Sequence, residues 1–173
     1  GGARPAPSIK KELRVNGVPR PASEFVGAVN VVAFSAEDLE LIVGGPAIRR
    51  RYLDILISQS DSSYLKMIQR YGRVVTQRNH LLRQMREGRV GLDELEFWDD
   101  RLVNEGAAII ERRALAVERL AVEAAPRHLA LSGGRERLGV VYRPRISAIA
   151  ENGLGDIPST IPDLIAVMRE ALE

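Results

Sequence analysis

The stretch FSAEDLELIVGGPAIRRRYLD, residues 34–54, holds more position-specific signals than any other part of the sequence. Ser35 is a typical N-cap residue. Asp38 lies three positions on, where its carboxylate can accept hydrogen bonds from the free backbone N–H groups of a first helical turn. We therefore predict a short helix over Ala36 to Val43, and with it the start of a helical region.

The second half of this stretch predicts another helix. Gly44-Gly45 should end the first helix, and Pro46 suits the first position of the next one, where its missing N–H costs nothing. The helix should continue over Ala47 to Ser58. Its candidate core side is formed by Ile48, Tyr52, Ile55 and Leu56.

Three consecutive arginines, Arg49 to Arg51, fall in the first turns of this second helix. Cations are disfavoured near a helix N-terminus because the macrodipole is positive there, so we expect an acidic group to face them. One alternative is an intramolecular ion pair with Glu37, Asp38, Glu40 or Asp54. The other alternative is a phosphate group of DNA or of a nucleotide, and the residues alone leave both open.

The same stretch resembles the sequence signature of the bacterial RecF proteins, which are SMC-like ABC ATPases. Ala36 departs from the family pattern, which has proline there, but Ser35 already caps that helix. Similarity continues on both sides of the signature, from Ile9 to about Pro144, so it covers nearly the whole chain. The matching signature positions, spacing included, are Glu37, Leu41, Ile42, Gly44, Gly45, Pro46, Arg49, Arg50, Tyr52, Leu53 and Asp54.

The composition fits one domain without metal or disulfide chemistry. The chain has 173 residues, 45% of them hydrophobic, which is enough to bury a core. It has no cysteine, which fits a cytoplasmic protein. Its two histidines, His80 and His128, are each alone, so we expect no metal site. No apolar run approaches the roughly 20 residues that span a bilayer, so we expect no membrane partner.

The first 34 residues predict a small β element. Residues 1–8, GGARPAPS, have the composition of a leader or tag. Lys10 to Val15 alternates and ends in Asn16-Gly17, the strongest short hairpin signal, with Val18 to Arg20 as the return strand. Asn30 to Phe34 is an apolar run of strand type. The resemblance implies that residues 9–34 come from the base of an ATPase head.

Residues 35–135 predict a helical arm. After the signature stretch, Asp61 should cap a helix that runs to about Glu87 and ends at Gly88, and a second helix should run from about Asp93 into the 120s. The short turn makes them antiparallel neighbours. The first helix has an apolar seam with Arg78 as its one polar member, namely Tyr64, Ile68, Tyr71, Val75, Arg78, Leu82 and Met85. The second has a stripe broken only by Arg113, namely Leu95, Trp98, Leu102, Gly106, Ile109, Val117, Leu120 and Ala124, in which Gly106 would let a partner helix approach closely.

Charge divides sharply between these two helices. Residues 61–91 carry a net charge of +5 and residues 92–125 a net charge of −5. The first interpretation is a complementary hairpin held by surface ion pairs. The second is a DNA-binding face, because several basic side chains lie away from the apolar seam. The DNA-binding candidates are Lys66, Arg70, Arg73 and Arg83, together with Arg49 and Arg50.

The end of the arm contains a deceptive motif. Pro126 should kink or end the second long helix, although a helix can resume after a bend. Leu131 to Arg135, LSGGR, mimics the nucleotide-contacting signature of ABC ATPases. That role needs glycines that open a helix, whereas these close one, so we interpret them as a C-cap. Residues 136–173 then predict a strand over Arg137 to Arg143, a loop over Asn152 to Pro158, and a last helix from Thr160 through Leu172.

No P-loop sequence occurs in the chain, and no acidic pair follows an apolar strand. We therefore expect no bound cofactor and no enzyme activity in this chain itself. The resemblance implies that it is the interior arm or lid domain of a RecF protein, and that the intact parent holds ATP and Mg²⁺ as a weakly hydrolysing ATPase. If Glu37 or Asp38 senses that nucleotide, Glu37→Gln should alter ATP-driven dimerisation of the parent.

The resemblance also implies a role in DNA replication, recombinational repair and the SOS response. The expected partners are gapped or single-stranded DNA, junctions of single and double strands, RecR, RecO, indirectly RecA, and a second protomer. The fold class we predict is mainly α, a long antiparallel helical hairpin with a small β element at its base. Two functions remain open: an arm that contacts DNA phosphates without reading sequence, or a protein-docking module for RecR or a second protomer.

Overall fold

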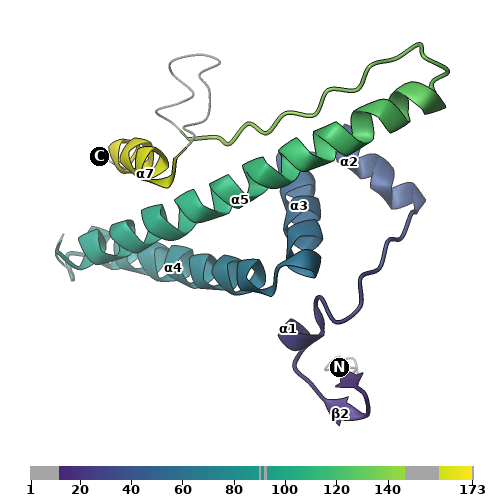
Figure 1. The fold of residues 1–173 in the computed structure, drawn as a ribbon. Coiled ribbons are helices and arrows are strands. Elements are labelled where there is room, and N and C mark those ends of the chain that lie inside the picture. The colour runs from purple at the N-terminus through teal and green to yellow at the C-terminus, as the bar shows by residue number, and fades with distance from the viewer. Residues whose placement is uncertain (1–11, 90, 92, 147–159, 173) are drawn as a thin grey trace, which may run out of the picture.

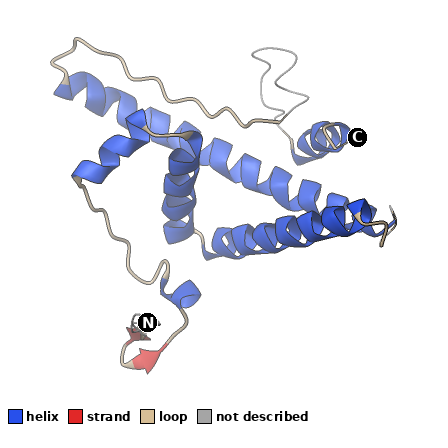
Figure 2. Cartoon of the chain, turned by 180° about the vertical axis from the view of Figure 1, so that it is seen from behind, coloured by secondary structure: helices blue, strands red, loops and turns tan. Residues whose placement is uncertain are grey.

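The computed structural model describes residues 12–89, 91, 93–146 and 160–172. Most of the described chain is helical, and two long helices lie side by side with a third helix across one end of the pair (Figures 1 and 2). The predicted fold class, mainly α with a long antiparallel helical hairpin and a small β element, is confirmed. The longer helices are α3 (Pro46–Ser60), α4 (Ser62–Arg86), α5 (Asp93–Leu131) and α7 (Ile161–Glu170).

The predicted β-hairpin forms at the turn that its sequence specifies. Strands β1 (Arg14–Val15) and β2 (Val18–Pro19) pair antiparallel. Asn16 and Gly17 between them both have positive φ, 51° and 81°, which is the geometry of a type I′ turn. The hairpin is followed by the single-turn helix α1 (Ala22–Phe25).

Two predicted strands are absent from the described part of the chain. Residues 30–34 form an exposed extended segment, in which Val32 is 99% exposed and the N–H of Val31 donates to Oε1 of Gln59. Residues 137–143 are also extended and unpaired, and they run back along α5 (Figure 1). Both predictions were wrong because a strand needs a neighbour, and β1 and β2 pair only with each other in the described residues.

The signature stretch folds as predicted up to α3. A 3₁₀ turn η1 (Ala36–Leu39) leads into α2 (Glu40–Val43), and the carboxylate of Asp38 accepts a hydrogen bond of 2.6 Å from the N–H of Ser35. Gly44 ends α2, and a Cβ placed there would lie 2.4 Å from the backbone oxygen of Glu40. Any side chain would clash with that backbone, so this sharp exit requires glycine.

The α4–α5 hairpin is antiparallel, as predicted. Asp61 caps α4, and Gly88, with φ of 70°, ends it. Ion pairs connect the two helices at Arg78–Asp99 and at Arg70–Glu105, so residue numbers rise along one helix as they fall along the other. The complementary charges of the two helices therefore pair across the hairpin.

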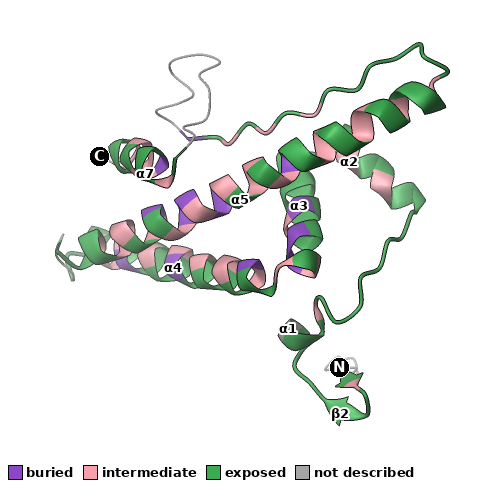
Figure 3. Ribbon diagram, in the orientation of Figure 1, coloured by how far each residue is buried: buried purple, intermediate pink, exposed green. Residues whose placement is uncertain are grey.

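Buried residues lie where the helices meet (Figure 3). One cluster joins α3, α4 and α5 through Ile57, Tyr64 and Ile109, and another joins α5 and α7 through Ala107 and Leu164. Tyr64, Tyr71 and Trp98 are buried or half-buried, as expected for seam residues. The predicted α4 seam omitted Val74 and Leu81, which are buried. A core-facing helix buries a stripe wider than a strict coiled-coil seam, which explains the omission.

At Pro126 the helix continues, which is one of the outcomes that the sequence left open. Helix α5 runs through this proline and ends at Leu131. Gly133 and Gly134 have φ of 64° and 79°, and the N–H of Gly134 donates to the backbone oxygen of Leu129, so the predicted glycine C-cap is confirmed. The last helix, α7, also forms as predicted, with Thr160 as its N-cap. The expected leader at residues 1–8 and the expected loop at residues 152–158 lie outside the described residues.

Candidate nucleic-acid interface

Arg49 has a structural partner that the sequence did not suggest. Its Nη1 donates to the backbone oxygens of Leu41, at 3.1 Å, and Gly44, at 3.0 Å. These carbonyls end α2, so the guanidinium sits at the negative end of that helix. Of the two alternatives for Arg49 to Arg51, ion pairs with nearby carboxylates do not form in the part of the chain that the structure describes, where Asp54 pairs with Arg113 instead.

The buried side of α3 is not the side that its apolar residues suggested. Ile48, Tyr52, Ile55 and Leu56 are 38% to 49% exposed, whereas Leu53, Ile57 and Ser58 are buried. The buried residues face α4 and α5, which both contact α3. The outer side of α3 and the end of α2 therefore present apolar side chains to solvent, among them Ile42 and Val43.

Asp54 forms the polar connection between α3, α4 and α5. Its carboxylate accepts two hydrogen bonds of 2.9 Å from Nε and Nη2 of Arg113, and one of 2.6 Å from the hydroxyl of Tyr64. Burial and the hydrogen bond to Asp54 both raise the pKa of Tyr64. Burial is the largest single effect on the pKa of Arg113 and lowers it, but the hydrogen bond to Asp54 and the attraction of Tyr64, Asp54 and Tyr142 together outweigh it and raise the pKa. The signature residue Asp54 is thus a partner within the fold.

The six DNA-binding candidates divide into two groups. Arg49 is bound to the end of α2. Arg70 forms a bidentate ion pair with Glu105, in which Nε and Nη2 of Arg70 lie 2.7 and 3.2 Å from the carboxylate oxygens. Arg50, Lys66, Arg73 and Arg83 are exposed and form no ion pair within the described ranges. Because a helix turns by about 100° per residue, Lys66 and Arg73 lie on the same side of α4. Arg83 lies about 80° from Arg73 around the helix axis. The exposed group is therefore a loose basic surface on α4, with Arg50 on α3.

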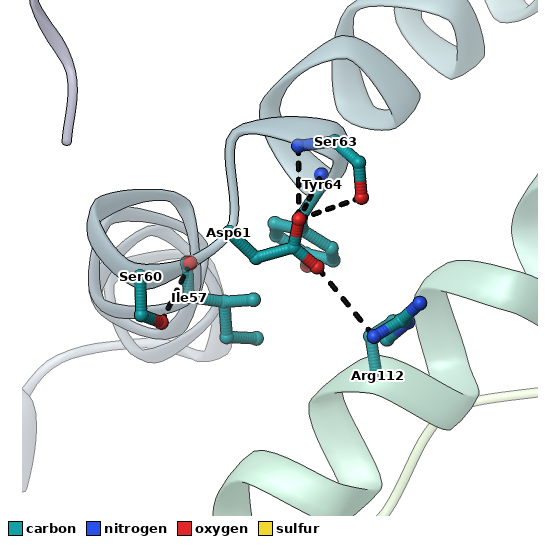
Figure 4. Close-up of polar contacts among 6 residues, drawn as sticks. All are labelled: Ile57, Ser60, Asp61, Ser63, Tyr64 and Arg112. Atoms are coloured by element: carbon teal, nitrogen blue, oxygen red, sulfur yellow. Dashed lines mark hydrogen bonds and ion pairs between the residues drawn. The ribbon is translucent and has the colours of Figure 1, made fainter.

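The junction of α3 and α4 is fixed by the cap residue Asp61 (Figure 4). One carboxylate oxygen accepts from the N–H of Ser63 at 2.9 Å, from the hydroxyl of Ser63 at 2.6 Å and from the N–H of Tyr64 at 3.3 Å. The other oxygen lies 3.5 Å from Nη1 of Arg112. The hydrogen bond from the Ser63 hydroxyl is the main cause that lowers the pKa of Asp61.

Asp61→Ala is expected to lower the free energy of unfolding by about 1 kcal/mol at neutral pH, the usual cost of losing an N-cap. The folded-state pKa of Asp61 is lowered, so the stabilisation is present above its ordinary value of 3.8 and is lost as the pH falls through the folded value. Urea unfolding of both proteins across acid pH checks this. A difference that stays constant down to the lowest pH would contradict the role of the ionised carboxylate.

Metal and membrane features are not found in the described ranges. No group of three or more His, Asp or Glu side chains there could hold a metal ion. No described helix is long and apolar enough to cross a bilayer.

Comparison with known proteins gives relatives that are named RecF. The chain is 38% identical over 170 residues to a DNA replication and repair protein RecF from Herpetosiphon aurantiacus, covering 97% of the chain and 43% of that relative. It is 40% identical over 141 residues to a RecF protein from a Synechococcus strain, covering 80% of the chain and 37% of the relative. The chain thus spans about two fifths of the length of these relatives. No protein-family model matches it.

Solved structures agree with the sequence relatives. The chain superposes with a TM-score of 0.81 and 30% identity on the recombination mediator protein RecF with ATP in the RecFOR pathway, covering 94% of the chain and 42% of that structure. A second RecF structure, with ATPrS, gives a TM-score of 0.78 at 29% identity. The resemblance to RecF proteins is therefore confirmed, for a chain that matches less than half of their length.

Proposed function

We propose that this chain is the non-catalytic arm of a RecF-type recombination mediator, and that α4 contacts DNA phosphates. The exposed cations Lys66, Arg73 and Arg83 carry this proposal, because they form no ion pair within the described residues and are free to neutralise phosphates. Arg50 on α3 extends the same charge. Contacts to phosphates position a protein on DNA without reading its sequence, so we propose contact without sequence preference.

The rest of such a protein would supply nucleotide chemistry. One matching RecF structure is described with ATP, whereas the chain has no P-loop sequence. We propose that ATP and Mg²⁺ are held by the remaining three fifths of a RecF protein. The exposed apolar residues of α3, such as Ile55 and Leu56, would pack against that part. The proposed parent acts in replication, recombinational repair and the SOS response in the cytoplasm, as an ATP-dependent dimer that works with RecR and RecO to load RecA on gapped DNA.

Fluorescence anisotropy on a gapped duplex at two salt concentrations tests the proposed DNA binding. Changing Lys66, Arg73 and Arg83 together to alanine should weaken binding. The slope of log affinity against log salt concentration should become shallower by about two to three, because each removed cation would have neutralised about one phosphate. Arg70 is left unchanged because it is paired with Glu105. Replacing it would disturb the hairpin as well as the charge.

The matched control changes Arg51, Arg119 and Arg137 to alanine. These arginines are also exposed, so the control removes the same net charge from other parts of the surface. Its affinity and salt dependence should stay close to those of the unchanged chain. Equally weak binding by the two triple variants would show that only net charge matters and would refute the assignment to α4.

A protein-docking module is the second candidate function. It is favoured by the apolar outer side of α3 and by the engagement of Arg49 and Arg70 within the fold. If the chain does not bind gapped DNA at low salt, this alternative stands, with RecR or a second protomer as the proposed partner.

A further inference from the structure

A groove of about 700 Å³ lies between α4 and α5. Of the three cations that carry the DNA proposal, Arg73 lines this groove, whereas Lys66 and Arg83 do not. Gly72, Arg73 and Val74 line it from α4, and Phe97, Trp98 and Arg101 line it from α5. Its position on the hairpin means that both helices contribute to any contact made there.

The lining of the groove includes polar and charged residues, but most of its exposed area is apolar and part of it is aromatic. Phe97 is 54% exposed, and its ring packs edge to face against Trp98, with centroids 5.3 Å apart and planes at 85°. Val74 is buried beside them. An exposed aromatic ring in a groove gains free energy when a partner's apolar side chain removes it from water.

Two arginines at the groove remain without an ionic partner in the described ranges. The carboxylate of Glu105, which also lines the groove, is neutralised by Arg70. Arg73 on α4 forms no ion pair, and the guanidinium of Arg101 on α5 stacks 5.4 Å from the ring centre of Phe97. One cation from each helix therefore accompanies the apolar lining, and together they favour an anionic ligand.

Gly72 keeps the groove open. Glycine inside a helix costs about 1 kcal/mol relative to alanine, so its presence in the middle of α4 is unfavourable for the helix itself. A Cβ at Gly72 would meet no atom within 4 Å, so close packing does not require the glycine. A side chain here would instead occupy the groove.

We propose that this groove binds an acidic peptide segment of a partner protein, with an apolar side chain of the peptide against Phe97 and Trp98. Carboxylates of the peptide pair with Arg73 and Arg101. This site shares Arg73 with the proposed DNA contact and otherwise uses other residues. A nucleic-acid strand fits less well, because base stacking needs an open ring face and Arg101 and Trp98 already cover parts of the Phe97 ring.

Trp98 is the one tryptophan of the chain, so its fluorescence reports directly on the groove. The probe is a short blocked peptide in which a Phe-Leu pair is flanked on both sides by Asp and Glu. We expect a saturable shift of the Trp98 emission. The same peptide with Asn and Gln for its acids, or with Ala for its Phe-Leu pair, should bind at least about tenfold more weakly, as expected for removing one charge-assisted or apolar anchor.

Two variants separate this proposal from the DNA contact. Gly72→Phe should weaken peptide binding by at least about tenfold while leaving gapped-duplex binding unchanged, because it fills the groove and removes no cation. The double variant Lys66→Ala, Arg83→Ala should do the reverse. Arg73→Gln is a second groove variant that leaves the backbone of α4 undisturbed, and it should weaken both peptide and DNA binding because Arg73 belongs to both proposed sites.

Several results would overturn the proposal. The first is a Trp98 emission that does not respond to the acidic peptide. The second is an emission that responds to a thymidine oligonucleotide instead, which would make the groove a nucleic-acid site. The third is full peptide binding by both Gly72→Phe and Arg73→Gln, which would place the peptide elsewhere on the chain.

Discussion

Replacing Arg113 with alanine should lower the free energy of unfolding by about 2–4 kcal/mol, the largest single effect that we expect from removing a charge in this chain. The side chains of Arg113 and Asp54 are only 14% and 24% exposed. Removing one member of a buried pair leaves the other charge uncompensated, at a cost of about 3–5 kcal/mol, and partial exposure reduces that figure here. Urea or thermal unfolding measures the difference.

The neighbouring arginine is a matched control. Arg112 lies 3.5 Å from Asp61, and its side chain is 47% exposed. Exposed pairs contribute at most about 1 kcal/mol, so Arg112→Ala should change stability much less than Arg113→Ala. Tyr64→Phe should show an intermediate destabilisation, because it removes only the hydroxyl that donates to Asp54. Equal destabilisation at the two arginines would contradict the role assigned to the Asp54 cluster.

This cluster shows what local sequence signals omit. Arg113 and Asp54 lie 59 positions apart, so no local pattern pairs them. A usable signal was nevertheless present, since Arg113 interrupts an apolar stripe and Arg78 interrupts an apolar seam. Each of them pairs with a carboxylate of another helix. In this chain a lone arginine within an apolar stripe thus marks a half-buried acidic partner on another helix, although the sequence does not say which one.

Local chemistry predicted the helix and turn boundaries well. The Asn16-Gly17 turn, the Asp61 cap and the Gly133-Gly134 ending all form as expected, because each depends on a few neighbouring residues. Two of the expectations that failed depend on distant partners. The apolar run at residues 30–34 found no neighbouring strand, and α3 buries the side that α4 and α5 cover.

The candidate interface was predicted only in part, for the same reason. Helical periodicity placed Lys66, Arg70 and Arg73 away from the seam, and all three are exposed. Periodicity does not show which cations are already engaged, so Arg70 and Arg49 were not distinguished from the others. Phe97 and Arg101 were missed as groove residues because their significance arises only when α4 lies beside α5.

Gly106→Leu should lower the free energy of unfolding by about 2–3 kcal/mol, even though leucine favours a helix more than glycine does. A Cβ at Gly106 would lie 2.7 Å from Cε of Met168 and 3.3 Å from the ring of Tyr71, so the side chain would separate α5 from both α7 and α4. The end of Met168 can move aside, but the half-buried ring of Tyr71 has less freedom. Thermal unfolding measures the destabilisation.

The same substitution at Gly72 provides the control, because a side chain there meets open space. Gly72→Leu should leave stability unchanged or raise it by up to about 1 kcal/mol, from the better helix propensity alone. The two substitutions should change the free energy of unfolding in different directions because other helices pack against Gly106, whereas Gly72 lies at the open groove. If Gly106→Leu were as stable as Gly72→Leu, α7 and α4 would not pack against α5 as closely as the structure shows.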